Sequence, residues 1–402
     1  MDTSCVIDRN ALRLSDLRGF AQLGVAATAG VADLVEAMHA AIARPHLGLR
    51  RAAPDRTTGI AGLVYRSIRG VTGLTGSVVD RVLTQRQGAY ADRSPQREAV
   101  LAALNGVLGD HLAATGNPLA LPMRLHRNGE PLELRTTALA EAVPQRGPKL
   151  LILVHGLCMN DLQWTRDGHD HGAMLADALG YTPLYLNYNS GLSIAGNGRR
   201  FAEMLETLLR QWPMPVEEIA IIGHSMGGLV ARSACSHAER LDHAWVKTLR
   251  HLVCMGSPHH GAPLERGGNW VDVVLAATPF AAPLARIGKI RSAGITDLRH
   301  GDALDTRSHT LLPKGVRSYA IAATTGERRS DLRDRWVGDG LVPVASALGH
   351  HPDPARTLPF PKSRQWIAYE TNHLDLLSDP AVADRLLRWL KQKPRQKLAS
   401  RP

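Results

Sequence analysis

Aromatic residues are scarce in this chain of 402 residues. Phe, Trp and Tyr make up 4% of it, so a folded core must be packed mainly from Leu, Ala, Val and Ile. No run of 18 apolar residues occurs, so no segment is predicted to cross a bilayer. The hydrophobic share of 44% is ordinary for a globular protein, and the length suits one large α/β domain with additions, or two domains.

Cysteine is also rare, and its spacing matches no paired metal-binding motif. The first 18 residues lack the apolar stretch of a secretory signal. A reduced protein in the cytoplasm is therefore the expectation. Three of the four cysteines stand in apolar segments, where a free thiol is a common core residue; the four are Cys5, Cys158, Cys235 and Cys254.

Acidic residues are too few to balance the basic ones, and the formal net charge is +11. Because the arginines are scattered among acids along the chain, no nucleic-acid partner is predicted. Basic residues are concentrated only between Lys391 and Arg401, and residues 396–402 are expected to form a basic tail. A solvated terminus is the first interpretation of this segment, and contact with an acidic surface is the second.

The stretch Glu218–Arg232 carries the motif Gly-His-Ser-Met-Gly at residues 223–227. An apolar, β-branched run precedes the motif and helix-forming residues follow it, which predicts a strand, a tight turn and a helix. The glycines on either side of the serine let the strand and the helix pass closely. Ser225 is therefore the candidate nucleophile.

From Pro148 onward, apolar strand patterns alternate with helix-length intervals, which indicates a mostly parallel sheet flanked by helices. Residues 146–395 are expected to form this α/β domain. The predicted strands are Lys149–Val154, Thr182–Tyr188, Ile219–Ile222, Leu249–Met255, Val316–Ala322 and Gln365–Tyr369. The predicted helices are Gly172–Leu179, Arg199–Trp212, Gly228–Ala238 and Pro380–Lys391.

Residues 1–145 are expected to form a mainly helical N-terminal extension, with helices at Ala26–Ala43, Gly59–Arg81 and Gln96–Leu112. Alternation between residues 123 and 135 predicts a short hairpin that turns at residues 127–130. The extension holds no catalytic motif. A cap, an oligomer surface and a brace for the main domain stay open as its role.

The strand and helix alternation fails between residues 263 and 307. The segment 276–287 is apolar, interrupted by proline and flanked by glycines, which favours a helical insertion over a core strand. We expect this insertion to act as a lid.

A serine hydroxyl is a weak nucleophile until a base takes its proton, and a third group must orient that base. Asp339 lies between two glycines after the strand 316–322, and His373 follows the last predicted strand. Asp375 is expected to brace the histidine loop. Alternatives for the acid are Asp331 and Asp334, and alternatives for the base are His350 and His351.

Four motifs in this order resemble the α/β hydrolases of the lipase and esterase group. His-Gly-Leu at 155–157 resembles their oxyanion loop, residues 223–227 their nucleophile elbow, residues 338–342 their acid loop and residues 372–375 their histidine loop. Gly-Ser-Pro-His-His-Gly at residues 256–261 also resembles the segment after the elbow helix in bacterial lipases. The resemblance implies an α/β-hydrolase fold over more than half of the chain, whereas the N-terminal third matches nothing in the small bacterial lipases.

The resemblance also implies roles for single residues. Ser225 attacks an acyl carbonyl, His373 transfers the proton, and Asp339 holds the imidazolium. The N–H groups of Leu157 and Met226 form the oxyanion hole. Structural roles are expected for the three other reactive side chains of the motifs, which are His224, His259 and Cys158.

No cofactor and no metal ion are predicted. Two alternatives to this expectation stay open. Asp375 and Asp379 stand where calcium-braced lipases have oxygen ligands, and residues 167–171 concentrate ligands that could hold zinc. A solvated loop is the preferred interpretation of both segments.

The sequence thus predicts a serine carboxylic-ester hydrolase, an esterase or lipase, that acts on a small-molecule or lipid ester with an apolar acyl group. A thioesterase, a polyester depolymerase and a lipid acyltransferase use the same triad and stay open. A non-catalytic scaffold on the same fold, or a surface-binding protein in transient contact with lipid, is the alternative of a different class. The oligomeric state is not predicted.

Overall fold

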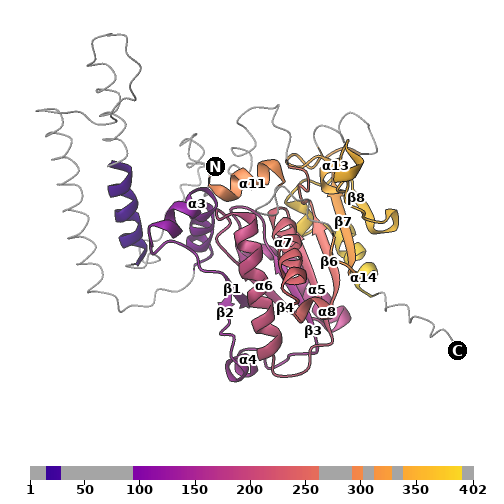
Figure 1. The fold of residues 1–402 in the computed structure, drawn as a ribbon, viewed down its shortest axis with the longest axis horizontal. Coiled ribbons are helices and arrows are strands. Elements are labelled where there is room, and N and C mark those ends of the chain that lie inside the picture. Colours follow the sequence, from indigo (N-terminus) through magenta and orange to yellow (C-terminus); the bar gives the residue numbers. More distant parts are fainter. Residues whose placement is uncertain (1–14, 29–93, 262–291, 302–311, 328–337, 392–402) are drawn as a thin grey trace, which may run out of the picture. The chain divides into compact units, whose positions relative to one another are not determined.

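The computed structural model describes residues 15–28, 94–261, 292–301, 312–327 and 338–391. Within them lies an eight-stranded sheet of order β2-β1-β4-β3-β5-β6-β7-β8 (Figure 1). The six strands β3 to β8 pair in parallel, whereas β1 is antiparallel to both of its neighbours. The strands are β1 (Arg124–Arg127), β2 (Glu130–Pro131), β3 (Lys149–Val154), β4 (Thr182–Asn187), β5 (Glu218–His224), β6 (Leu249–Met255), β7 (Arg317–Ala323) and β8 (Gln365–Ala368).

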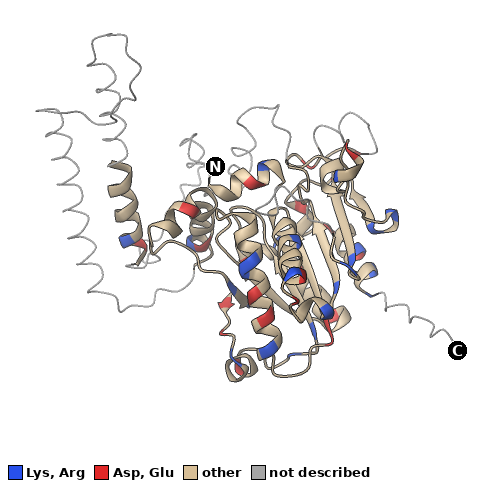
Figure 2. Cartoon of the chain, in the orientation of Figure 1, with Lys and Arg blue, Asp and Glu red and all other residues tan. Residues whose placement is uncertain are grey.

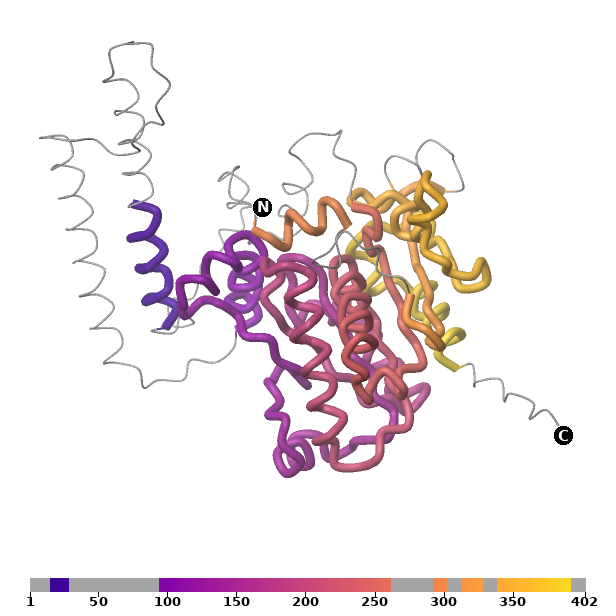
Figure 3. Tube along the Cα trace, in the orientation of Figure 1, coloured from indigo at the N-terminus to yellow at the C-terminus, as the bar shows by residue number. Residues whose placement is uncertain are grey.

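Helices connect the strands and cover the sheet (Figure 3). A helix over residues 15–28 precedes them. The α-helices that follow are α3 (Pro95–Ala114), α4 (Thr136–Ala142), α5 (His171–Leu179), α6 (Ile194–Gln211), α7 (Met226–Arg240), α8 (Trp245–Thr248), α11 (Ala293–His300), α13 (Val344–Ala347) and α14 (Pro380–Leu390). Short 3-10 helices are η2 (Asp161–Trp164), η4 (Pro354–Arg356), η5 (Lys362–Arg364) and η6 (Asp375–Leu377).

The central strand β3 shows why the sheet is buried on both faces. Leu150, Ile152 and Val154 point to one side and join a core that includes residues of α6 and α7. Leu151 and Leu153 point to the other side and join a core built with α5 and α14. Alternation along a strand thus divides one apolar run between two cores, as expected for a parallel strand covered by helices.

All six predicted strands are present. The bounds predicted for β3 and β6 are those observed: β3 is buried from Leu150 onward, and β6 is buried except at Arg250. Helix α6 begins at Ile194, five residues before the predicted start at Arg199. Ser193 caps it by accepting a hydrogen bond from the Gly196 N–H, and Gly198 brings α6 close to Ser233 of α7. Gly198, a residue type that disfavours helices, here allows α6 and α7 to pack closely.

The predicted hairpin is confirmed as β1 and β2. Asn128 and Gly129 form its turn, and both have positive φ, at 51° and 79°. Such a two-residue turn suits the twist of paired strands. Strand β1 also pairs with β4, so the hairpin is part of the main sheet although it was predicted within the N-terminal extension.

The chain divides into two compact units. One comprises Met1–Arg97 and Leu112–Ala120, and the other comprises Glu98–His111 and Leu121–Pro402. Within the first unit, Asp16 of the helix 15–28 forms an ion pair with Arg97 at 2.6 Å. The predicted division at residue 145 stays a prediction.

Several predicted features lie outside the described residues in whole or in large part. These are the helices at 26–43 and 59–81, the tail 396–402 and most of the insertion 263–307. The described part of the insertion is the helix α11, while its action as a lid stays a prediction.

Among the described helices, none combines the length and the apolar character needed to span a membrane. Figure 2 shows basic and acidic residues interspersed along α6.

Candidate active site

Ser225 stands on the turn between β5 and α7. Its φ of 54° and ψ of −124° are unfavourable for a residue with a side chain. The surrounding backbone leaves no room for side chains on the flanking glycines: a Cβ on Gly227 would lie 2.1 Å from the carbonyl oxygen of Val154, and one on Gly223 would lie 2.5 Å from the N of Gly228. The strand, strained turn and helix predicted from the sequence are therefore found.

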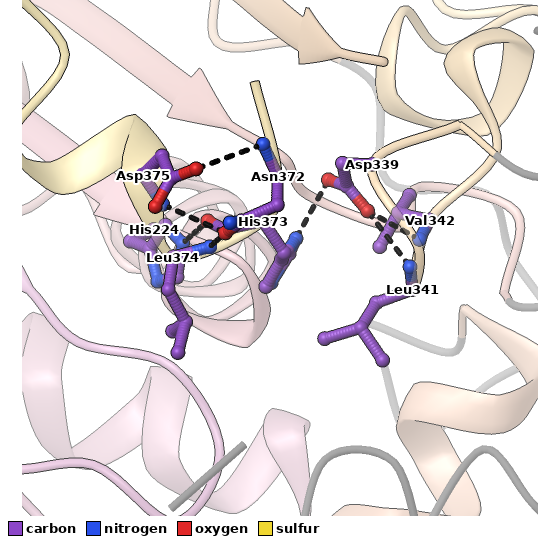
Figure 4. A network of polar contacts seen from close by, with 8 residues as sticks. All are labelled: His224, Asp339, Leu341, Val342, Asn372, His373, Leu374 and Asp375. Atoms are coloured by element: carbon purple, nitrogen blue, oxygen red, sulfur yellow. Dashed lines mark hydrogen bonds and ion pairs between the residues drawn. The ribbon is translucent and has the colours of Figure 1, made fainter. Parts of the chain in front are cut away.

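His373 and Asp339 form a buried hydrogen-bonded pair (Figure 4). Nδ1 of His373 lies 2.7 Å from Oδ2 of Asp339, and their side chains are 7% and 0% exposed. The other oxygen of the carboxylate accepts hydrogen bonds from the N–H groups of Leu341 at 2.9 Å and Val342 at 2.8 Å. Because the carboxylate accepts from Nδ1–H, Nε2 of His373 is left as the basic nitrogen.

Backbone contacts bring the histidine loop to the serine turn. The N–H of Ser225 donates to Met255 at the end of β6, and a Cβ on the next residue, Gly256, would lie 3.0 Å from Cε1 of His373. The His373 N–H also donates to the Asp339 carbonyl at 3.1 Å. Ser225 follows β5, Asp339 follows β7 and His373 follows β8, so all three stand at the carboxyl ends of parallel strands, where α/β sheets bind ligands.

The predicted oxyanion loop lies beside the serine. A Cβ on Gly156 would be 3.0 Å from Cβ of Ser225. Within the part of the chain that the structure describes, the N–H groups of Leu157 and Met226 donate to no protein acceptor, whereas that of Cys158 donates to Oγ of Ser190. Two N–H groups at the start of a helix and on an adjacent loop can hold a negative oxygen.

His155, for which no role was predicted, fixes the start of this loop. Its Nδ1–H donates to the Gly156 carbonyl at 2.8 Å, and its Nε2 accepts from the Tyr188 N–H at 3.3 Å. The Tyr188 hydroxyl donates to the His155 carbonyl, and the two rings stack with centroids 4.3 Å apart. Complete burial lowers the pKa of His155 to about 4, so the ring stays neutral.

His224 contacts His373 directly. Its Nε2–H donates to the carbonyl oxygen of His373 at 3.0 Å, and the ring centroids lie 4.7 Å apart. Burial, and then the neighbouring charge of His373, hold the pKa of His224 well below the usual value for histidine. The His224 ring is therefore neutral beside His373.

The alternative residues for the triad lie outside the described residues or contact other groups. Asp331 and Asp334 lie outside the described residues. His351 accepts from the Asp353 N–H and contacts His260 with its ring, while Asp375 accepts from the Asn372 N–H. The Asp339 carboxylate, by contrast, contacts His373.

Two other side chains with predicted structural roles are buried. His259 accepts a hydrogen bond from Arg232 at 3.0 Å. Burial raises the pKa of Cys158 to about 12, which keeps its thiol protonated and unreactive.

The carboxylates of the calcium alternative are engaged with the protein. Asp379 caps α14 by accepting from Ala381 and Val382, and it also accepts from the Thr371 hydroxyl at 3.0 Å. Both nitrogens of His171, in the zinc alternative, are used: Nε2–H donates to Leu376 and Nδ1 accepts from His169. Among the residues described, no cluster of three His, Cys, Asp or Glu side chains could hold a metal ion.

Residues 169–323 match the family model of the PGAP1-like alpha/beta domain. The match runs from the loop before α5 to the end of β7 and includes the Ser225 turn. Together with the strand order, it decides the architecture. The chain has the α/β-hydrolase fold. Asp339 and His373 lie beyond the matched segment.

Solved structures of α/β hydrolases are similar at low identity. The mature lipase BlEst2 of Bacillus licheniformis is 18% identical over 67% of this chain and 97% of its own, with a TM-score of 0.42. The RedJ thioesterase of Streptomyces coelicolor is 18% identical over 61% and 91%, with a TM-score of 0.37. A lipase-esterase related protein of Clostridium acetobutylicum is 14% identical over 61% and 95%, with a TM-score of 0.34. No curated protein matches the chain.

Proposed function

We propose that this α/β hydrolase is a serine carboxylic-ester hydrolase that works through an acyl-enzyme on Ser225. The observation that carries the proposal is the buried 2.7 Å hydrogen bond between Nδ1 of His373 and Oδ2 of Asp339. This bond selects the tautomer with a free Nε2, the form that can take a proton from a serine hydroxyl. Ser225 stands on a strained turn, and its N–H donates to Met255 at the end of β6. Its side chain supplies the hydroxyl from which His373 takes the proton.

The reaction has two halves. In the first, Oγ of Ser225 attacks the ester carbonyl carbon while Nε2 of His373 takes the hydroxyl proton. The tetrahedral intermediate then expels the alcohol, which receives that proton, and leaves an acyl-serine. In the second, His373 removes a proton from water as the water attacks the acyl group, and the acid is released with Ser225 restored.

The surrounding groups stabilise the charges that develop. The N–H groups of Leu157 and Met226 donate to the oxyanion, and one such donor is worth on the order of 3 kcal/mol in the transition state. Asp339, held by two N–H donors from Leu341 and Val342, stabilises the imidazolium of His373. The partner expected is a small-molecule or lipid ester, and the chemistry requires neither cofactor nor metal.

The test is hydrolysis of p-nitrophenyl esters of graded chain length by the wild type and by Ser225→Ala and His373→Ala. Both variants should lose at least about 1,000-fold in kcat and stay folded by circular dichroism. Ser233→Ala is the matched control, because Ser233 is buried in α7 and its hydroxyl has no hydrogen-bond partner among the described residues. It should retain full activity.

Further substrates separate the related chemistries. A thioesterase would prefer thioesters to the matched oxygen esters, and an acyltransferase would pass the acyl group to an added alcohol faster than to water. A wild-type protein that neither turns over esters nor is labelled by a fluorophosphonate would contradict the proposal and favour a non-catalytic role.

A further inference from the structure

Helix α3 touches the loop that carries the proposed oxyanion donor. Gly106 of α3 lies so close to Cys158 that a Cβ on residue 106 would be 2.2 Å from Sγ and 3.1 Å from both N and Cα. The Cys158 thiol, which burial keeps protonated, lies 3.8 Å from the carbonyl of Ala103, one turn earlier in α3. The backbone of the helix therefore packs directly on the backbone of the loop.

Cys158 adopts a conformation that its surroundings must maintain. Its φ of 59° is unfavourable for a residue with a side chain, and such strain persists only where neighbouring groups hold it. The side chain is buried, and the N–H donates to Oγ of Ser190 at 3.1 Å. Since Leu157 directly precedes Cys158, these contacts fix the peptide that joins the two residues and so restrain the backbone of Leu157.

The same helix also holds the loop after β4, to which Ser190 belongs. Nδ2 of Asn189 donates to the carbonyl of Gly109 at 2.8 Å, and a Cβ on Gly109 would lie 1.8 Å from Oδ1 of Asn189. The loop that contains Cys158 and the loop that contains its hydrogen-bond partner Ser190 thus both pack against α3. They do so at Gly106 and Gly109, where only a residue without a side chain fits.

The insertion is joined to α3 as well. Oγ of Ser292 donates to the carbonyl of Gly106 at 2.7 Å, and the carboxylate of Asp110 accepts from the Ala293 N–H at 3.0 Å. In Figure 1, α3 and α11 lie side by side, as these two hydrogen bonds require. The insertion helix α11 therefore begins at α3.

We infer that the segment Glu98–His111 of α3 is a positioning element that holds the oxyanion loop through the contact of Gly106 with Cys158. The inference rests on the proposed function for its kinetic consequence, but the mechanical contact can be tested without it. It assigns a role to part of the N-terminal third of the chain, whose sequence shows no catalytic motif. A helix outside the catalytic motifs would then determine where the Leu157 N–H points.

The experiment compares Gly106→Ala, Cys158→Ala and the double variant with the wild type. Hydrogen exchange measured by mass spectrometry reports the oxyanion loop directly, and fluorophosphonate labelling with ester kinetics reports its effect. Gly106→Ala should speed exchange in the peptide covering residues 155–160 by about tenfold and leave β6 unchanged. A displacement of about 1 Å in this loop should lower kcat by about 100-fold.

Removal of the sulfur makes room for the new methyl group. The double variant should therefore recover most of the exchange protection and at least tenfold of the lost kcat relative to Gly106→Ala. Gly24→Ala is the matched control, because a Cβ on Gly24 meets nothing within 4 Å and should change neither measurement.

The outcomes separate the two proposals. Unchanged exchange at residues 155–160 in Gly106→Ala, or a double variant that is no better than the single one or does not fold, overturns the inference. If Gly106→Ala alone does not fold and the double variant does, the contact is supported. A wild type without activity contradicts the proposed function only, since the exchange pattern would still decide whether α3 holds the loop.

Discussion

The Nε2–H of His224 donates to the carbonyl oxygen of His373 at 3.0 Å, so the residue before the proposed nucleophile holds the backbone of the proposed base. The two residues are 149 positions apart in the chain. A glutamine can place an amide N–H where Nε2 lies, whereas a methionine of similar length cannot.

From this contact, His224→Met should lower kcat about tenfold, the effect expected from a loss near 1.4 kcal/mol. His224→Gln should stay within about threefold of the wild type. Ester kinetics and thermal unfolding of both variants check this prediction. Equal kcat values for the two variants, or a loss that follows unfolding temperature alone, would show that the hydrogen bond does not position His373.

Asp339→Asn should lower kcat by about 1,000-fold to 10,000-fold with little change in KM. An amide next to Nδ1 favours the tautomer that carries its proton on Nε2, which cannot accept a proton from serine. Asp375→Asn is the matched control, because the Asp375 carboxylate accepts a hydrogen bond from the Asn372 N–H, whereas the Asp339 carboxylate contacts the His373 ring. A similar loss in both variants would assign Asp375 a share of the acid's role.

Gly227→Ala should reduce the free energy of unfolding by about 3 kcal/mol or more, because the added methyl would meet the Val154 carbonyl at 2.1 Å. Gly147→Ala serves as the comparison, since a Cβ there would have only an ordinary contact at 3.6 Å. Urea denaturation measures both. Equal stability of the two variants would refute close passage of β3 and α7.

Stability should fall as the pH is lowered from 6.5 to 4. Burial lowers the pKa values of His155, His171 and His251 to about 4. In this interval the unfolded chain binds protons that the folded chain excludes, so the free energy of unfolding decreases with falling pH. The slope is about 1.4 kcal/mol per pH unit for each such histidine. Above pH 7 these groups are neutral in both states and contribute no slope.

The variant His251→Phe tests the assignment. It removes one of these histidines while keeping an aromatic ring against Tyr319, with which His251 stacks at 5.8 Å. Urea denaturation between pH 7 and 4.5 measures the free energy of unfolding at each pH. Its slope against pH should be smaller than that of the wild type by about 1.4 kcal/mol per pH unit, the contribution of one histidine. An unchanged slope would mean that His251 titrates alike in the folded and unfolded chain.

Chelation should leave both activity and unfolding temperature unchanged. The Asp379 carboxylate already accepts from two N–H groups and a hydroxyl, so it is committed to the start of α14 and to Thr371. Dialysis against EDTA, followed by ester hydrolysis with and without added Ca²⁺, measures this. Activity that is lost on dialysis and restored by Ca²⁺ would favour the calcium alternative.

Much of the catalytic domain could be predicted because its signals are local. Strand β3 is apolar after Lys149, β6 is apolar apart from Arg250 and His251, and the Gly-His-Ser-Met-Gly motif specifies its own turn. The start of α6 could not be predicted, since Gly196 and Gly198 are residue types that disfavour helices. The helix nevertheless begins there, because Ser193 caps it and Gly198 packs against Ser233.

The sequence by itself predicted the order of strands and helices and the turn at Ser225, and it led to the proposal of Asp339 and His373 as partners of Ser225. These follow from periodicity and from residue types on predicted loops. Tertiary structure decided what each reactive group touches: that His224 holds His373, that the hairpin joins β4, and that α3 meets the oxyanion loop at Gly106. Such contacts join residues 50 or more positions apart, and their specificity comes from close packing, which a one-dimensional pattern of residue types does not encode.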